Sequence, residues 1–199
     1  MKTRVGQLVM NLVGILVGML IVVPRTALAD GPPPTPPPPA NVNSVGIIGG
    51  PSEPGERLVF SGQVFAPDGL TPVPGVIVYA YQTDATGHYQ ADPETHVARL
   101  HGWAKTDAQG HYEFHTIRPA PYPSRNIAAH IHFHIWGAGY PLQWTPELMF
   151  AGDSFIRPEQ IQASAGMGKF GNVQPLMKGS DGTLRCIFNI RANTVTNYR

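Results

Sequence analysis

Beyond residue 55 the chain consists of short segments in which apolar and polar residues alternate, separated by turn residues. In a strand, residues two apart share a face, so this period predicts β-strands. No segment here shows a sustained helical period with capping residues. The pattern predicts an all-β fold, an antiparallel β-sandwich with long loops. The strands are predicted at residues 58–65, 75–82, 112–117, 130–135 and 184–190, and the run GVIVYAYQ at 75–82 is predicted as a central strand from its β-branched and aromatic residues.

A short run of turn residues occurs twice in this region. Residues 83–89 read TDATGHY, and residues 106–112 read TDAQGHY. In each run the Asp side chain can bond to its own backbone, and the Gly can adopt a positive φ. Both runs therefore predict a tight turn between strands, the first ending at Tyr89 and the second at Tyr112.

The N-terminus has the pattern of an export signal. A basic start is followed by an apolar core at residues 12–23 and by the small residues Ala27, Leu28 and Ala29. This order predicts a cleaved signal peptide over residues 1–29 and a secreted or extracytoplasmic protein. The alternative is a membrane anchor that stays uncleaved, because residues 5–23 are just long enough to span a bilayer.

Residues 30–54 are rich in proline and in small or polar residues, and include the run PPPTPPPP. Such a run prefers extended polyproline geometry and cannot bury a core, so it predicts a semi-rigid tether. A proline-rich recognition ligand is the less favoured alternative. The folded domain is predicted over residues 55–199.

Composition excludes several classes of partner. The formal charge is +1, and loss of residues 1–29 would remove three basic residues and no acidic one, which leaves 1 − 3 = −2. A chain so close to neutral offers no electrostatic case for nucleic acid, and we expect a membrane partner only if the signal stays uncleaved. Cys186 is the single cysteine, so no disulfide can form within the chain. Self-association into a homo-oligomer stays open.

All eight histidines lie between His88 and His134, and the densest cluster is HIHFH at residues 130–134. On a strand the three histidines share one face. Residues two apart are separated by roughly 6.6 Å, which lets two imidazoles meet at one ion, whereas residues four apart are too far apart. The cluster therefore predicts two metal ligands, and spacing does not fix which pair is used.

The other ligands would decide the metal. Two neutral imidazoles alone suit Zn, Cu or Fe. Six tyrosines lie in the same half of the sequence, and a phenol becomes a ligand only where a strong cation removes its proton. Hard, anionic phenolates favour Fe(III), so a site with two tyrosines and two histidines would be a ferric site.

Several strings resemble the intradiol ring-cleavage dioxygenases. They are VYAYQTDATGHY at residues 78–89, GWAKTDAQGHYEFHTIRPAPYPSR at 102–125, AHIHF at 129–133 and FAGD at 150–153. The resemblance covers about residues 62–153, which is most of the predicted domain. The protocatechuate dioxygenase type fits best, because the helical N-terminal extension of catechol dioxygenases is missing.

The resemblance implies a ligand set and an activity. The ligands of a non-haem Fe(III) would be Tyr89, Tyr122, His130 and His132. The substrates would be O2 and a small aromatic diol of the catechol type, opened between its two oxygenated carbons to a muconate-type diacid. Tyr122 would leave the metal and take up a substrate proton, which makes it a catalytic residue as well.

The sequence departs from the family pattern at two positions. The family has Arg three residues before the first histidine, where its charge polarises the substrate, but this chain has Ile127 there. Arg125, two residues earlier, is the candidate replacement. Glu147 stands where the family has Gln, and brings an acidic group near the site. These departures motivate an alternative hypothesis, a dioxygenase-like module that binds metal or aromatic ligands with little or no turnover.

Overall fold

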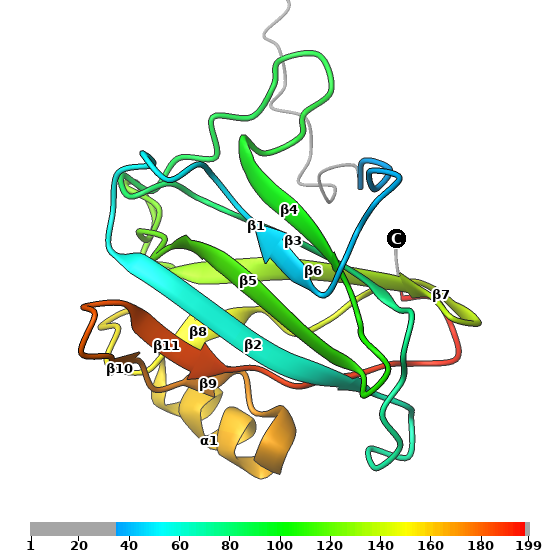
Figure 1. Ribbon diagram of the computed structural model, residues 1–199. Coiled ribbons are helices and arrows are strands. Elements are labelled where there is room, and N and C mark those ends of the chain that lie inside the picture. Colours follow the sequence, from blue (N-terminus) through cyan, green and yellow to red (C-terminus); the bar gives the residue numbers. More distant parts are fainter. Residues whose placement is uncertain (1–34, 198–199) are drawn as a thin grey trace, which may run out of the picture. The chain divides into compact units, whose positions relative to one another are not determined.

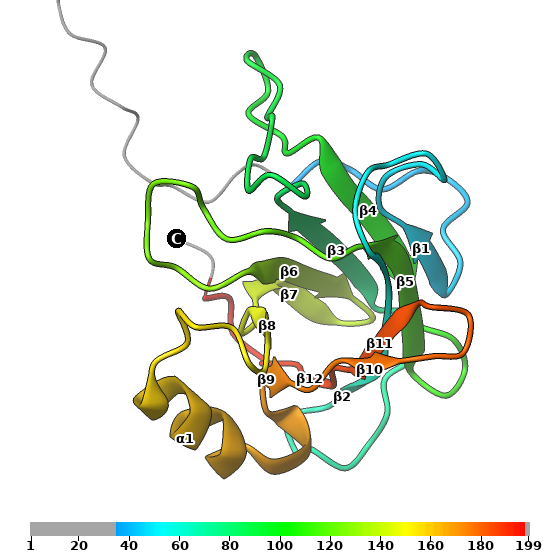
Figure 2. The same ribbon diagram turned by 90° about the vertical axis from the view of Figure 1, so that its left-hand side faces the viewer.

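The computed structural model describes residues 35–197. The predicted signal peptide at residues 1–29 lies outside these residues. Two six-stranded sheets form a sandwich, and Figures 1 and 2 show the sheet that contains β2 and β5 packed against the sheet that contains β3 and β6. The described residues contain no helix with the length and apolar character needed to cross a membrane.

The first sheet has the strand order β1-β5-β2-β11-β10, and β12 pairs with β2 as well. Its strands are β1 (Val45–Ile47), β2 (Arg57–Phe65), β5 (His111–Ile117), β10 (Met177–Lys178), β11 (Leu184–Ile187) and β12 (Ile190–Arg191). The second sheet has the order β4-β3-β6-β8-β9, and β7 pairs with β6. Its strands are β3 (Ile77–Gln82), β4 (Leu100–Lys105), β6 (His130–Gly137), β7 (Tyr140–Trp144), β8 (Leu148–Phe150) and β9 (Val173–Gln174).

The predicted all-β sandwich is confirmed, but the structure differs from the prediction in the direction of some strand pairs and in the strand predicted at residues 184–190. The long pairings, β2 with β5 and β3 with β4 and β6, are antiparallel as expected. Parallel pairings also join β1 to β5, β11 and β12 to β2, and β8 to β9, so both sheets are mixed. The strand predicted at residues 184–190 is interrupted, and its two parts pair with successive stretches of β2.

One helix was not predicted. Helix α1 (Pro158–Gly166) begins with Pro at its first turn, where a missing N–H costs nothing, and is followed by the 3-10 turn η1 (Gly168–Phe170). Ser164 is its one buried residue, and the Oγ of Ser164 accepts the Val173 N–H at the start of β9. A helix held by a polar contact, with no apolar stripe, leaves no periodic signal in the sequence.

The sandwich also begins earlier than predicted. Strand β1 lies inside the predicted 30–54 tether, yet it pairs with β5 along Val45, Gly46 and Ile47. The next residue, Ile48, is buried in the core. A Cβ on Gly46 would meet the ring of Phe114 at 2.3 Å, so the two strands approach closely at this point. The last residues of the proline-rich region are therefore part of the folded domain.

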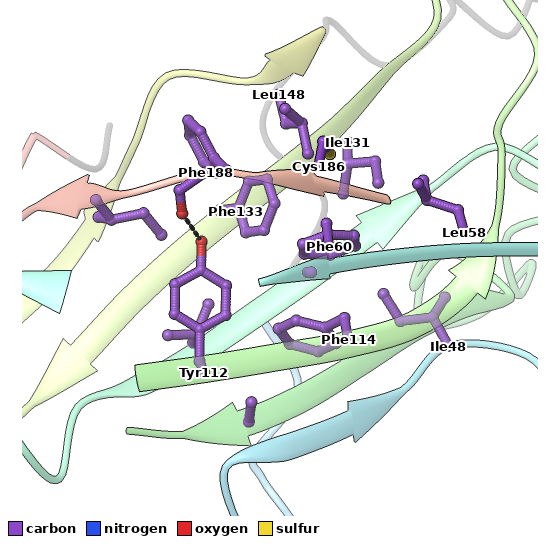
Figure 3. Packing of buried hydrophobic residues seen from close by; sticks show 14 of the residues in the cluster. Ile48, Leu58, Phe60, Tyr112, Phe114, Ile131, Phe133, Leu148, Cys186 and Phe188 are labelled. Atoms are coloured by element: carbon purple, nitrogen blue, oxygen red, sulfur yellow. Dashed lines mark hydrogen bonds between the residues drawn. The ribbon is translucent and has the colours of Figure 1, made fainter. Parts of the chain in front are cut away.

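The core lies between the sheets and orients β6. Figure 3 shows Phe60, Phe114, Phe133 and Phe188 packed together, with the Tyr112 hydroxyl donating to the Phe188 carbonyl at 2.5 Å. Strand β6 contributes Ile131, Phe133 and Ile135 to this core. Because side chains alternate across a strand, the histidines of β6 must point to the opposite face.

Candidate metal centre

Two histidines of β6 meet on the outer face of the second sheet. Nε2 of His130 and Nε2 of His132 lie 3.0 Å apart, and their ring planes are 84° from parallel. His130 is buried and His132 is partly buried. The spacing argument for an H-x-H pair is therefore met by residues 130 and 132.

Two tyrosines complete the cluster. The hydroxyls of Tyr89 and Tyr122 lie 2.6 Å apart. The Tyr122 hydroxyl is 3.3 Å from Nε2 of His130, and the Tyr89 hydroxyl is 2.8 Å from Nε2 of His132. The four atoms form a closed ring of short distances, so the structure brings together all four side chains that the sequence proposed as ligands.

Tyr89 is positioned by the first of the two repeated turns. Asp84 accepts the N–H groups of Thr86 and His88 through Oδ1, and its backbone N–H donates to the His88 carbonyl. The backbone of Arg99 then donates to the Tyr89 carbonyl at 3.0 Å. Asp107 makes the same bonds in the second turn. That turn leads directly into β5, so its tyrosine, Tyr112, enters the core instead.

The loop that carries Tyr122 is fixed against the Tyr89 turn. The backbone of Ala120 donates to Asp84 O and accepts from the Thr83 hydroxyl. Gly87, at φ +84°, lies so close to Pro121 that an added Cβ would stand 2.1 Å from the Pro121 carbonyl oxygen. Only glycine fits this approach, and the approach is what allows the two phenols to meet.

Polar contacts at the second ring nitrogens, a hydrogen bond for His130 and an ion-pair contact for His132, orient both imidazoles. Nδ1 of His130 lies 2.7 Å from Ala128 O, and a carbonyl can only accept, so Nδ1 carries the hydrogen. Nδ1 of His132 lies 3.0 Å from Oε1 of Glu147, which again favours the hydrogen on Nδ1. Both Nε2 atoms are then left with a lone pair for a metal, as ligating histidines require.

Asp153, from the FAGD string, supports the start of the ligand strand. Its Oδ2 accepts the Ala129 N–H at 2.9 Å, and its Oδ1 accepts the Phe155 N–H. The carboxylate thus fixes the backbone next to His130. The sequence identified the FAGD string but assigned no role to Asp153. An acidic residue inside a string that matches the family, with no basic residue beside it, is the one feature of the sequence that could have indicated such a role.

Burial sets the protonation of the cluster. Burial and the neighbouring Tyr122 raise the pKa of Tyr89 far above its ordinary value, so this phenol ionises only if a cation binds. Burial and the adjacent His132 lower the pKa of His130, which keeps its imidazole neutral. Burial alone would raise the pKa of Glu147, but its contact with His132 outweighs burial and lowers it.

These donors fit a hard, highly charged metal ion. Two neutral imidazoles and two phenols that need a strong cation to ionise are the set expected for Fe(III). Among the described residues, the cluster of His130, His132 and Glu147 also places three potential ligand atoms within 4.8 Å of one another. The carboxylate adds a nearby negative charge that further favours a cation.

Three other residues discussed from the sequence lie elsewhere. The side chain of Arg125 is exposed, and its backbone N–H donates to the Tyr122 carbonyl at 3.3 Å, so it lies on the turn beside Tyr122. Ile127 is 39% exposed on the same loop. His134 is fully buried and its Nδ1 lies 2.5 Å from the Thr35 hydroxyl, not in the cluster.

Comparison with known proteins places this site in a family. A family model described as Dioxygenase matches residues 38–193. The protocatechuate 3,4-dioxygenase beta chain of Burkholderia cepacia is 33% identical over 118 residues, which are 54% of this chain and 50% of that protein. Chlorocatechol 1,2-dioxygenase of Rhodococcus opacus is 31% identical over 133 residues, 56% and 50% of the two chains. The chain spans about half the length of these curated relatives.

Solved structures share the fold. The dioxygenase domain of a dioxygenase carbohydrate-binding protein fusion from Streptomyces sp. SirexAA-E superposes with a TM-score of 0.60 at 23% identity, over 83% of this chain and 96% of that one. An intradiol ring-cleavage dioxygenase from Tetranychus urticae gives a TM-score of 0.55 at 21% identity, over 77% and 87%. The family match covers most of the sequence, and the relatives and the fold agree with it. The chain therefore belongs to the dioxygenase family that contains the intradiol ring-cleavage enzymes.

Proposed function

We propose that this protein binds one non-haem Fe(III) through Tyr89, Tyr122, His130 and His132 and cleaves catechol-type rings with O2 to muconate-type diacids. The observation that carries the proposal is the closed ring of two phenol oxygens and two Nε2 atoms, separated by 2.6–3.3 Å. The relatives named as protocatechuate and chlorocatechol dioxygenases support an enzyme over a module without turnover.

A ferric ion at this site would supply a Lewis acid that binds the diol through its two oxygens and makes the ring itself reactive toward O2. The protein's part is to hold the four donors in place. Tyr89 follows a turn that the Asp84 side chain stabilises by hydrogen bonds, and His130 and His132 lie on β6, which is paired with a strand on each side. These three donors form the rigid part of the site.

Tyr122 is the donor suited to move a proton. It lies on a loop between two prolines, and its hydroxyl contacts both Tyr89 and His130. A phenolate on this loop can accept a proton from a substrate hydroxyl and turn away, while the other three donors stay in place. Arg125, on the same turn, is the nearest candidate in this loop for a cation facing the reacting ring.

The proposal extends to the protein's location and partners. Residues 1–29 support export, with a membrane anchor as the alternative if the segment stays uncleaved. The partners are then a small aromatic diol and O2, both encountered outside the cytoplasm. Self-association into a homo-oligomer is open to measurement by light scattering.

The test is the visible spectrum of the iron-loaded protein, recorded before and after anaerobic addition of catechol. Tyrosinate bound to Fe(III) absorbs visible light, so we expect a coloured protein whose band shifts with catechol, followed by O2 uptake and a ring-opened diacid on admitting air. Tyr89→Phe and Tyr122→Phe should each weaken the band, whereas Tyr112→Phe, whose hydroxyl bonds in the core, should keep it. A colourless protein with full iron content would refute the proposal.

A further inference from the structure

The end of the proline-rich run lies against the second sheet. The hydroxyl of Thr35 is 2.5 Å from Nδ1 of His134 on β6, and the indole N–H of Trp103 on β4 donates to the Pro36 carbonyl at 3.2 Å. Further along, the Lys105 N–H donates to the Asn43 carbonyl at 2.7 Å. Residues 35–43 therefore cross the sheet from β6, past β3, to the edge strand β4, with contacts near both ends.

The surface under this segment is made of aromatic rings. The outward-facing residues of β3 and β4, Tyr79 and Trp103, have ring centroids 5.5 Å apart, and the His101 ring is 4.9 Å from Trp103. His134 lies 5.6 Å from Tyr79 and 4.3 Å from Trp144. Tyr79 and His134 are both fully buried although they face away from the core of the sandwich.

Polyproline geometry suits such a surface. A chain in this conformation makes no internal hydrogen bonds, so its carbonyls need outside donors, and its restricted backbone loses little entropy on docking. Aromatic grooves that recognise proline-rich segments use these two properties. The bond from the Trp103 indole to Pro36 and the aromatic surface below it match that mode of recognition.

We propose that residues 35–39 are an intramolecular ligand of this aromatic face, and that Thr35 is a positioning residue for the metal centre. The connection runs through His134, which Thr35 contacts. The ring of His134 meets Tyr81 edge-on at 5.5 Å, and Tyr81 is stacked on His132 at 4.6 Å. Trp144 also touches both histidine rings, at 4.3 Å and 6.2 Å.

The docked segment thus completes the packing behind one proposed ligand. When Thr35 is in place, His134 is held between Tyr79, Tyr81 and Trp144, and the Tyr81 ring has a fixed surface against which to hold His132. Loss of the Thr35 contact would let His134 reorient and would loosen His132, without touching any of the four donors.

The first experiment uses the full-length, metal-free protein and is independent of iron. Hydrogen exchange of the Trp103 indole N–H, assigned with Trp103→Phe, reports whether Pro36 covers it. Thr35→Val keeps the shape of the side chain but removes the hydroxyl, and should speed exchange roughly five- to tenfold, as expected for one lost hydrogen bond. Thr35→Ser should behave as the unaltered protein. The matched control is Thr71→Val, which removes an exposed threonine hydroxyl that bonds to Asp68 in the loop between β2 and β3.

A second variant tests the segment as a ligand. Residues 35–39 are replaced by an equal length of Gly and Ser in the full-length chain, and a synthetic peptide of residues 30–42 is added. We expect fast indole exchange in this variant and slowing by the peptide, but not by a peptide with Gly and Ser at residues 35–39. Unchanged indole exchange in both Thr35→Val and the replaced chain would overturn the proposal.

The positioning role rests on the proposed iron site and has its own measurement. In iron-loaded protein, transfer of iron to a chelator should be several-fold faster for Thr35→Val than for Thr35→Ser or Thr71→Val. Equal rates for all of them would overturn the positioning role. A protein that binds no iron at all would instead refute the proposed function, and the indole measurement would still decide whether the segment docks.

Discussion

The ring of Tyr81 is stacked on the ring of His132, with centroids 4.6 Å apart and planes 11° from parallel. The two residues are direct partners across the β3–β6 pairing. Tyr81 is not among the ligands that the resemblance implies. The structure shows that its packing is against a proposed metal ligand, so the same ring stabilises the sheet and limits rotation of the imidazole.

Replacing this ring should affect metal binding more than stability alone explains. Tyr81→Leu should lower the free energy of unfolding by about 2–4 kcal/mol, as for other large buried side chains, and should also weaken metal binding. Tyr112→Leu is the matched control, since Tyr112 is equally buried but faces the core. Calorimetric unfolding and metal titration of both variants would check this, and equal metal affinities would contradict it.

Gly87→Ala should separate the two tyrosines. The substitution places a Cβ 2.1 Å from the Pro121 carbonyl oxygen at a residue with φ +84°, so the turn and the Tyr122 loop must move apart. Gly182→Ala has a similar φ of +79° and open space around it, and isolates the backbone strain of about 1 kcal/mol. We expect Gly87→Ala to lose more stability than this control and to bind metal weakly, as measured by denaturant unfolding and metal content.

Glu147 should contribute to metal affinity through His132. Loss of a group that orients a ligating histidine typically costs 10–100-fold in affinity, so we expect an effect of about that size for Glu147→Ala. Glu147→Gln keeps an acceptor for the Nδ1–H and should lose less. Glu113→Ala removes a carboxylate that contacts His115 at 2.6 Å on the other sheet, and should leave metal titrations unchanged.

Asp84 should make stability depend on pH in the acidic range. Burial alone would raise its pKa, but the bonds it accepts from Thr86, His88 and Gln90 bring the pKa down to about 2. A depressed pKa means that the contribution, about 2 kcal/mol, is present above the unfolded value near 3.8 and is lost as pH falls through about 2.

The measurement is denaturant unfolding between pH 5 and the lowest pH at which the protein stays folded. Asp84→Asn should be less stable than the unaltered protein at pH 5, and the difference should shrink below pH 4. Asp107→Asn, in the equivalent turn, is the control for loss of a turn carboxylate away from the site. A constant difference at all pH values would show that the charge of Asp84 has no part in stability.

Alternation and runs of β-branched and aromatic residues were enough to predict the sandwich and its central strands. These strands, β2, β3, β5 and β6, have six residues or more and line the core with alternate residues. Alternation could not predict β1, because this strand has only three residues and is held by hydrogen-bonded pairing with β5, which is distant in the sequence. Helix α1 was not predicted for a different reason: it buries only Ser164 and has no apolar stripe that would give a helical period.

The candidate site, too, could be predicted only in part from the sequence. Spacing alone predicted that two β6 histidines would converge, but it could not choose between the pairs or distinguish Tyr89 from Tyr112, since both end the same turn. The resemblance made that choice, and the different paths of the chain after each turn explain it. The contacts of Glu147 with His132 and of Thr35 with His134 join distant segments, so no local pattern reveals them.

The parallel pairing of β11 and β12 with β2 has a consequence for how the protein is made. The Gln63 N–H donates to Asn189, 126 positions later, so one edge of β2 stays unpaired until the residues of β11 and β12 have been made. Such distant pairings slow folding, and an open strand edge invites other chains to pair with it. During synthesis, residues 57–65 would offer that edge to neighbouring nascent chains until residues 184–191 have been made.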